Sequence, residues 1–220
     1  LVTDPAWVKR IETITGRLVT EAIKLDPSTK DWKWSVAIID DPDTLNAWCM
    51  AGGRMAIYTG IVTQLNLSDD EIAQIMGHEI SHALANHTAE RMSRAVLMNG
   101  ALAATAVVTD NNGYVLTGTA MAAKVALELP NSRTAESEAD EIGIELATRA
   151  GYNPDAAVSL WKKMAEAGGG GGPEFLSTHP SPDNRASRLD KLGEKMLKLN
   201  PQLKKSQVYP VTIVTDSKEV

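Results

Sequence analysis

The sequence predicts a single α+β domain that is mostly helical and carries a small β-sheet near its N-terminus. Three observations support this fold class. Apolar residues recur at three- and four-residue steps along most of the chain, which is the spacing of one helix face. Short runs with the composition of strands occur before residue 60 and again after residue 207. The 220 residues include 43% hydrophobic and 23% charged side chains, as in one globular domain.

Charge and cysteine content narrow the class further. The formal net charge is −6, and Lys and Arg form no dense cluster, so we expect no nucleic-acid partner. Cys49 is the only cysteine, so no internal disulfide forms and a packed core must stabilise the fold. We expect one domain over residues 1–220, with a flexible glycine loop at 168–172 and a C-terminal tail at 205–220.

The first third of the chain predicts a helix followed by three strands. Residues 5–25 place apolar side chains on one helical face, and Asp26-Pro27-Ser28 ends that helix. Three stretches with strand character follow, at 34–39, 45–50 and 54–59. A turn at Gly52-Gly53 joins the last two strands, and the short apolar stretch at 60–67 predicts a helical turn.

A capping box opens the next helix, with Ser68 at the N-cap position and Glu71 three residues later. We expect this helix to continue to about Glu90 or beyond. Residues 95–129 contain two apolar stretches of about 15 residues, which predict a hairpin of two buried or partly buried helices. A membrane-spanning helix needs about 20 such residues, so contact with a membrane is the alternative interpretation.

The C-terminal half predicts three more helices and a strand. The helices are one capped by Asn131 or Ser132 and ended by Gly151, one from Asn153-Pro154 to about Ala167, and one over 183–199. Residues 208–215 are rich in Val, Thr and Ile and predict a terminal strand, in which Pro210 favours an edge position.

A pair of histidines is the most informative motif. His78 and His82 are four residues apart, so both rings leave the same face of the helix that begins after Ser68. Two neutral imidazoles at this separation can bind one Zn²⁺. Glu79 lies about 100° around the helix, close enough to meet a water molecule on the metal without binding the metal itself. The alternative is a pair of surface histidines, but the apolar neighbours indicate that the helix is buried there.

A catalytic zinc ion usually has three protein ligands, and the third candidate is Glu136. Asp140 lies on the same helix face, where we expect it to accept the free N–H of a ligating histidine. Glu138 is about 200° around from Glu136 and is expected to face solvent, and a solvated acidic face is the alternative for all three. His87 is turned about 500° from His82 along a continuous helix, away from the metal, so we interpret it as structural.

These motifs resemble those of the M48 metallopeptidases. The resemblance rests on the segments His78–His82, Glu136-x-x-Ala139-Asp140 and Thr178-His179-Pro180, and it covers about residues 40–192. The family includes the membrane CAAX-protease, HtpX heat-shock and mitochondrial quality-control types and soluble bacterial envelope members. The chain is most similar to the soluble branch, because residues 95–129 are too short and too broken to match the membrane-spanning helices of the others.

The resemblance implies a zincin-like (gluzincin) domain with an active-site helix and one Zn²⁺ per chain. His78, His82 and Glu136 would hold the metal, and Glu79 would be the general base. His179 and Arg185 are similar to a late loop that folds over the metal, where His179 would fill the fourth position or the two would stabilise the oxyanion. The strand at 54–59 would lie at a sheet edge and bind an extended substrate through its backbone. The residues that the resemblance assigns to this substrate edge are Asn46, Arg54, Met55, Ala56, Ile57 and Tyr58.

The implied activity is that of a zinc endopeptidase acting on misfolded or unassembled polypeptides in the bacterial periplasm or cell envelope. Residues 1–7 lack the pattern of a signal peptide, so this location depends on the resemblance. Two alternatives stay open: a zinc hydrolase of non-peptide substrates, and a chaperone or adaptor with a closed zinc site. Peripheral contact with a membrane or a membrane protein is a further expectation for the apolar hairpin.

Overall fold

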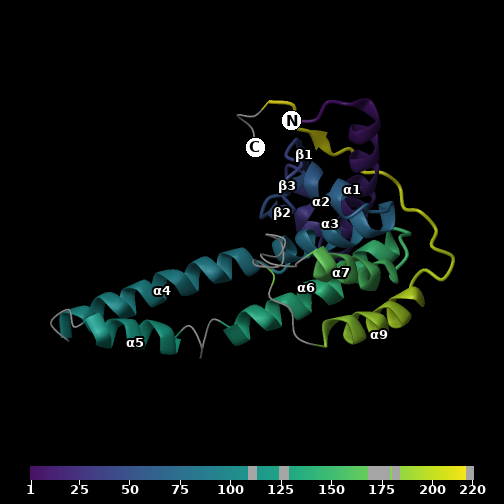
Figure 1. Ribbon diagram of the computed structural model, residues 1–220. Coiled ribbons are helices and arrows are strands. Elements are labelled where there is room, and N and C mark those ends of the chain that lie inside the picture. Colours follow the sequence, from purple (N-terminus) through teal and green to yellow (C-terminus); the bar gives the residue numbers. More distant parts are fainter. Residues whose placement is uncertain (109–112, 124–128, 168–178, 180–183, 217–220) are drawn as a thin grey trace.

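The chain begins with helix α1 (Pro5–Leu25), as its apolar pattern predicts. In this computed structural model, which describes residues 1–108, 113–123, 129–167, 179 and 184–216, Asp4 caps the helix. The Asp4 carboxylate accepts hydrogen bonds from the backbone N–H groups of Ala6 and Trp7. The buried face of α1 packs against the sheet and helix α3 (Asp69–Leu84), as Figure 1 shows.

Four strands form one mixed sheet in the order β2-β3-β1-β4. They are β1 (Ser35–Ile39), β2 (Ala47–Met50), β3 (Arg54–Tyr58) and β4 (Thr212–Ile213). β2 and β3 form an antiparallel hairpin, and β1 pairs in parallel with β3 on one side and β4 on the other. The hairpin turn depends on Gly52 and Gly53, whose φ angles of 91° and 86° are left-handed.

The prediction that residues 54–59 lie at a sheet edge is wrong. β3 is paired with β2 on one side and with β1 on the other, and residue 59 already belongs to helix α2 (Thr59–Gln64). The glycine turn joins β3 to β2, but the parallel pairing with β1 is a long-range contact that no local pattern encodes. One sheet edge is therefore β2, and the other is the predicted terminal strand, β4, which has only two residues.

Helix α3 is buried through most of its length, and both hydrogen bonds of its predicted capping box form. The Ser68 hydroxyl accepts from the Glu71 N–H, and the Glu71 carboxylate accepts from the Ser68 N–H. The helix ends at Leu84, several residues earlier than predicted. Asn86 adopts a left-handed φ of 57°, so the chain changes direction before the next helix begins at His87.

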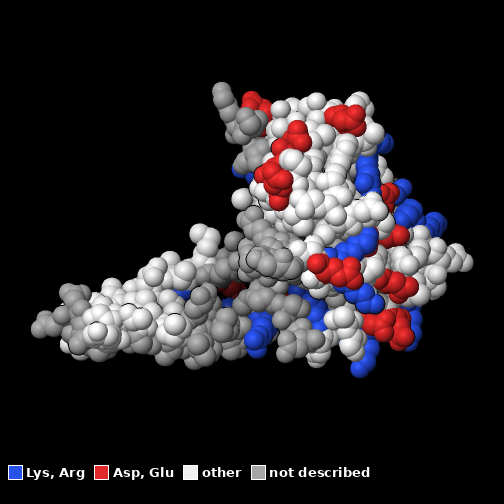
Figure 2. All heavy atoms as spheres, in the orientation of Figure 1, with Lys and Arg blue, Asp and Glu red and all other residues white. Residues whose placement is uncertain are grey.

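Helices α4 (His87–Val108) and α5 (Gly113–Ala123) form the predicted hairpin, and its burial is only partial: Met98, Leu102 and Leu116 are partly buried, while most described residues are exposed. The hairpin projects from the body (Figure 1), and no described residue from 89 to 135 is buried. Its described surface carries few charged atoms (Figure 2). The large apolar side chains exposed on it, by 61% to 94%, are Met92, Val96, Leu97, Val107, Val108, Tyr114 and Met121. No helix in the described parts of the chain has both the length and the apolar character needed to cross a membrane.

The remaining helices are α6 (Leu129–Arg149), α7 (Ala156–Ala167) and α9 (Arg185–Leu197). α6 begins before the caps that the sequence predicts, and it ends as predicted beside Gly151, whose φ is 94°. The predicted loop at 168–172 lies outside the described residues. The predicted tail runs along α1, where the Tyr209 N–H donates to the Gly16 carbonyl, and then contributes β4 to the sheet.

Helices α3 and α6 cross at two glycines. A Cβ atom on Gly77 would lie 2.9 Å from the carbonyl oxygen of Gly143, and a Cβ atom on Gly143 would lie 2.9 Å from the backbone of His78. Real Cβ atoms do not approach other atoms so closely, so larger residues would push the helices apart. The two glycines therefore set the distance between the helices that carry the predicted ligands.

Candidate metal centre

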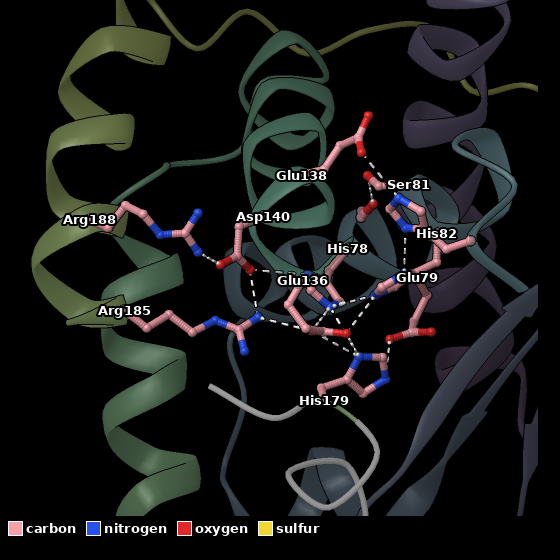
Figure 3. A network of polar contacts seen from close by, with 12 residues as sticks. His78, Glu79, Ser81, His82, Glu136, Glu138, Asp140, His179, Arg185 and Arg188 are labelled. Atoms are coloured by element: carbon pink, nitrogen blue, oxygen red, sulfur yellow. Dashed lines mark hydrogen bonds and ion pairs between the residues drawn. The ribbon is translucent and has the colours of Figure 1, made fainter. Parts of the chain in front are cut away.

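His78 and His82 lie on the same face of α3, as their spacing predicts. Both are buried, and their Nε2 atoms are 3.1 Å apart. The helix sets this separation, because residues i and i+4 are one turn apart. The Nδ1 atoms of the two rings face other partners, so both Nε2 atoms point into the same small space (Figure 3).

Helix α6 brings Glu136 to this space from a distant part of the sequence. Its Oε2 atom is 3.2 Å from His78 Nε2, and its Oε1 atom is 3.3 Å from His82 Nε2. Glu136 is only 1% exposed, so water does not solvate its charge. The predicted third ligand thus lies within reach of an ion that both histidines contact.

His179 completes a cluster of four donors. Its Nδ1 atom is 3.3 Å from His78 Nε2 and 3.1 Å from each carboxylate oxygen of Glu136. Its Nε2 atom is 3.4 Å from Glu79 Oε1. In the part of the chain that the structure describes, this is the only group of three or more His, Cys, Asp or Glu side chains that could hold a metal ion.

The separations given above are close to those between the ligand atoms of one tetrahedral ion. Bonds of about 2.0–2.1 Å place the ligand atoms of such an ion about 3.3–3.4 Å apart, and the contacts given above range from 3.1 to 3.3 Å. Without a cation or an added proton, histidine Nε2 atoms and carboxylate oxygens would face one another as acceptors, which is unfavourable in a buried site. Imidazole and carboxylate are ligands for Zn²⁺, and they also bind other divalent ions.

Asp140 lies behind His78 and connects it to two arginines of α9. Its Oδ1 atom is 3.2 Å from His78 Nδ1 and can accept that N–H. Arg185 donates to the same oxygen at 2.6 Å, and Arg188 donates to Oδ2. The Arg185 guanidinium also stacks on the ring of Trp161, 3.3 Å from its centroid. Arg188 is a site residue that the motifs do not indicate, although its place one helical turn after Arg185 is a usable signal.

His87 is outside the donor cluster, but it contacts His82 directly. Its Nδ1 atom is 2.9 Å from His82 Nδ1, and its Nε2 atom is 3.3 Å from Glu138 Oε2. The expected rotation of about 500° assumes a continuous helix, whereas α3 ends and Asn86 redirects the chain. The Glu138 side chain is 54% exposed, in agreement with its predicted solvent-facing position, yet its carboxylate reaches His87.

Burial and neighbouring charges shift the pKa values of the two α3 histidines in opposite directions. Burial disfavours charged His78, but hydrogen bonds with Asp140 and Glu136 outweigh it and raise the pKa to about 9. For His82, burial dominates and lowers the pKa to about 4. Burial opposes the charge on Glu136 as well, but hydrogen bonds with His179, His78 and His82 hold its pKa far below the usual range. Without a metal, a proton on His78 therefore balances the Glu136 carboxylate.

Glu79 lies beside the cluster and contributes no atom to it. It is 4% exposed, and burial raises the pKa of its carboxyl group although neighbouring His179 and His78 oppose the shift. A hydrogen bond with the Cys49 backbone connects Glu79 to strand β2. A carboxylate with a raised pKa is a better proton acceptor than one in water, which suits general base chemistry.

The structure separates the residues that the sequence assigns to a substrate strand. Five of them form β3 inside the sheet: Arg54, Met55, Ala56, Ile57 and Tyr58. Asn46 alone adjoins the open edge, since it precedes β2, and its carbonyl accepts from the Tyr58 N–H.

Comparison with known proteins identifies one family. The family described as "Peptidase family M48" matches residues 5–193. The mitochondrial metalloendopeptidase OMA1 of Saccharomyces cerevisiae is 32% identical over 194 residues, which are 83% of this chain and 54% of that protein. The mitochondrial metalloendopeptidase OMA1 of Bos taurus is 33% identical over 184 residues (79% and 35%). The Beta-barrel assembly-enhancing protease of Yersinia pestis is 27% identical over 197 residues (85% and 39%). The chain spans about half the length of the yeast relative and less of the other two.

Proposed function

The chain belongs to peptidase family M48, and on that premise we propose that it is a zinc-dependent endopeptidase. The observation that carries this proposal is the convergence of four donor atoms, from three separate segments, on one buried point beside Glu79. Buried acceptors in this arrangement need a cation to balance them. The names of the relatives as metalloendopeptidases support peptide bonds as the target.

In this proposal, His78, His82 and Glu136 hold the zinc ion. When bound, zinc lowers the pKa of a water molecule to about 7 and polarises a carbonyl group. Glu79 accepts the proton of the attacking water and delivers it to the leaving amine. The raised pKa of Glu79 supports this role, because it brings the carboxyl group closer in acidity to the groups with which it exchanges the proton.

His179 must move before a substrate binds. Its Nδ1 atom takes the place of a fourth ligand, and its Nε2 atom contacts Glu79, so the ring covers both the metal position and the base. We therefore interpret the arrangement of these side chains as a closed one. We assign His179 this closing role alone, in place of the oxyanion role that the resemblance also implies.

Arg185 acts in this proposal as a positioning residue, in place of the oxyanion role expected for it. Its guanidinium donates to Asp140 and lies 3.7 Å from Glu136. Its positive charge therefore compensates the negative charges of the two buried carboxylates, and less of it is available to stabilise the oxyanion of a substrate. The pKa of Asp140 is lowered, despite burial, by His78 and Arg185, which keeps it ionised and able to accept from His78.

We assign substrate binding to the edge of β2, Ala47–Met50, in place of the interior strand β3. β2 packs against α3, and Cys49 connects it to Glu79. A peptide added to this edge would pair through its backbone and place a carbonyl near the base. Backbone pairing does not read side chains, so the substrates of this proposal are extended segments of misfolded or unassembled polypeptides.

We propose further that the protein acts in a cell envelope and that its hairpin contacts a lipid surface. The Yersinia relative, named for β-barrel assembly, supports the envelope location. Residues 95–108 and 113–123 contain no Lys, Arg, Asp or Glu, and large apolar side chains on them, among them Leu97, Val107 and Tyr114, are exposed. The protein should sediment with phospholipid vesicles, and Leu97→Glu combined with Val107→Glu should abolish that binding. Equal sedimentation of both forms would contradict the contact.

The activity is tested by elemental analysis together with cleavage of an unfolded protein. The purified protein should hold about one zinc per chain, and His82→Ala should lose it. Glu79→Gln should keep the zinc and lose about 10²–10⁴-fold in cleavage rate. Glu141→Gln is the matched control, because this exposed carboxylate of α6 pairs only with Lys195 among the described residues and should change neither readout.

The same variants separate the alternatives. Cleavage by Glu79→Gln at the rate of the unmutated protein would refute the role of Glu79. Hydrolysis of a small ester, without cleavage of unfolded protein, would indicate a hydrolase of non-peptide substrates. The closed arrangement around His179 is the observation that favours a chaperone or adaptor, and suppression of partner aggregation by Glu79→Gln, with no cleavage by the unmutated protein, would support that function.

A further inference from the structure

We propose that His87 and Glu138 form a relay that holds His82 in the tautomer and orientation required for metal binding. The inference rests on the proposed metal site but concerns two residues that are not ligands. Neither belongs to a motif that assigns them a role. Both lie on the side of His82 that faces away from the donor cluster.

The change of direction after α3 creates this contact. Asn86, in its left-handed conformation, ends the path of α3 and turns the chain so that His87 begins α4. The His87 ring then returns to the His82 ring, with centroids 5.0 Å apart and planes inclined at 69°. His87 is 6% exposed, so solvent does not replace the contact.

The positions of the protons follow from the geometry. To bind a metal through Nε2, His82 must carry its proton on Nδ1. That N–H faces His87 Nδ1 at 2.9 Å, so His87 Nδ1 must accept, and His87 must carry its own proton on Nε2. His87 Nε2 faces Glu138 Oε2 at 3.3 Å and donates to this carboxylate, which can only accept. This single arrangement of protons satisfies the hydrogen-bonding groups of His82, His87 and Glu138.

The two metal histidines are thus supported in different ways by the same helix. For His78, the α6 carboxylate of Asp140 accepts the Nδ1–H directly at 3.2 Å. For His82, no carboxylate of the described residues contacts Nδ1, and His87 spans the gap to Glu138. Removal of His87 would leave a buried N–H without an acceptor, and the His82 ring would turn or change tautomer to avoid that cost.

The test measures metal binding and tautomer, with activity left aside. His87→Phe keeps a ring and removes the acceptor, and it should weaken zinc binding about 10–100-fold in competition with a chelator. His87→Asn places an amide oxygen near the position of Nδ1 and should restore most of that loss. Glu138→Ala should weaken binding less than His87→Phe, and Glu141→Ala on the same helix should leave it unchanged. Long-range ¹H–¹⁵N NMR of the zinc-loaded protein should show His87 protonated on Nε2 alone.

Each outcome decides the proposal. Zinc affinity in His87→Phe equal to that of the unmutated protein would overturn the relay, and so would a His87 proton on Nδ1. If His87→Phe does not fold, equal zinc affinity in Glu138→Ala and the unmutated protein would overturn the relay in its place, and the NMR spectrum tests the tautomer without any variant. Failure of the unmutated protein to bind zinc would instead refute the proposed function, so the two failures are distinguishable.

Discussion

Replacing Gly143 by alanine should weaken metal binding without altering a ligand. A Cβ atom at this position would lie 2.9 Å from the Cα and N atoms of His78 and 3.1 Å from the carbonyl carbon of Gly77. Non-bonded carbon atoms prefer separations of about 3.5–4.0 Å. Helices α3 and α6 must therefore move apart by about 0.6–1 Å where they cross.

This displacement is larger than a metal site tolerates. Ligand distances need to stay within about 0.2 Å of their normal values, and Glu136 on α6 must meet His78 and His82 on α3. We expect zinc affinity to fall at least about tenfold, which corresponds to about 1.4 kcal/mol. Overpacking should also lower the free energy of unfolding of the metal-free protein by about 1–3 kcal/mol.

Chelator competition and urea unfolding measure the two effects separately. Gly100→Ala is the matched control, because no atom lies within 4 Å of a Cβ at that α4 position. It should leave zinc affinity unchanged and stabilise the helix by roughly 0.5–1 kcal/mol. If Gly143→Ala binds zinc as tightly as Gly100→Ala does, the glycine crossing does not set the ligand spacing and the reasoning fails.

Two further predictions concern the histidines. In the metal-free protein, the free energy of unfolding should rise between pH 4 and 6.5, because folded His82, with its pKa of about 4, cannot take the proton that the unfolded chain holds. It should fall between pH 6.5 and 9, because folded His78, with its pKa of about 9, then loses a stabilising proton. Asp140→Asn should make this alkaline decline smaller, because only Glu136 then favours the proton on His78, and a flat urea-unfolding profile would contradict both shifts. His179→Ala should speed cleavage of a short fluorogenic peptide about tenfold if the closed arrangement holds about 90% of the molecules. An unchanged rate in that variant, with zinc still bound, would show that His179 does not block the site.

Local patterns predict most of the elements of this fold. The apolar face of α1, the capping box at Ser68 and the glycine turn between β2 and β3 are all confirmed. Each is decided by residues that are neighbours in the sequence, through side-chain periodicity, hydrogen bonding to the helix N-terminus or left-handed backbone. The spacing of His78 and His82 belongs to the same class, since one helical turn determines it.

Contacts between segments that are distant in the sequence cannot be predicted from such local patterns. The place of β3 inside the sheet depends on its parallel pairing with β1, and a pattern of alternating residues is the same for an edge and an interior strand. The burial of the hairpin is predicted only in part, for a related reason. Its apolar composition predicts buried or partly buried helices, but its described residues after position 88 are partly buried at most, and composition alone does not say which surface, if any, covers an apolar face.

Local patterns and contacts between distant segments both determine the site, and His87 is the residue at which the local pattern gives the wrong position. Helical periodicity carried beyond Leu84 turns His87 away from His82, and that argument is valid for as long as the helix continues. One left-handed residue, Asn86, cancels it, because a change of chain direction resets the angular position of every later side chain. Asn tolerates this conformation better than most residues, so an Asn just before a buried histidine is a signal to test a helix break before assigning the face of that histidine. The residues behind a metal ligand are therefore the part of such a site that periodicity predicts least well, even where the ligands themselves can be read from their spacing.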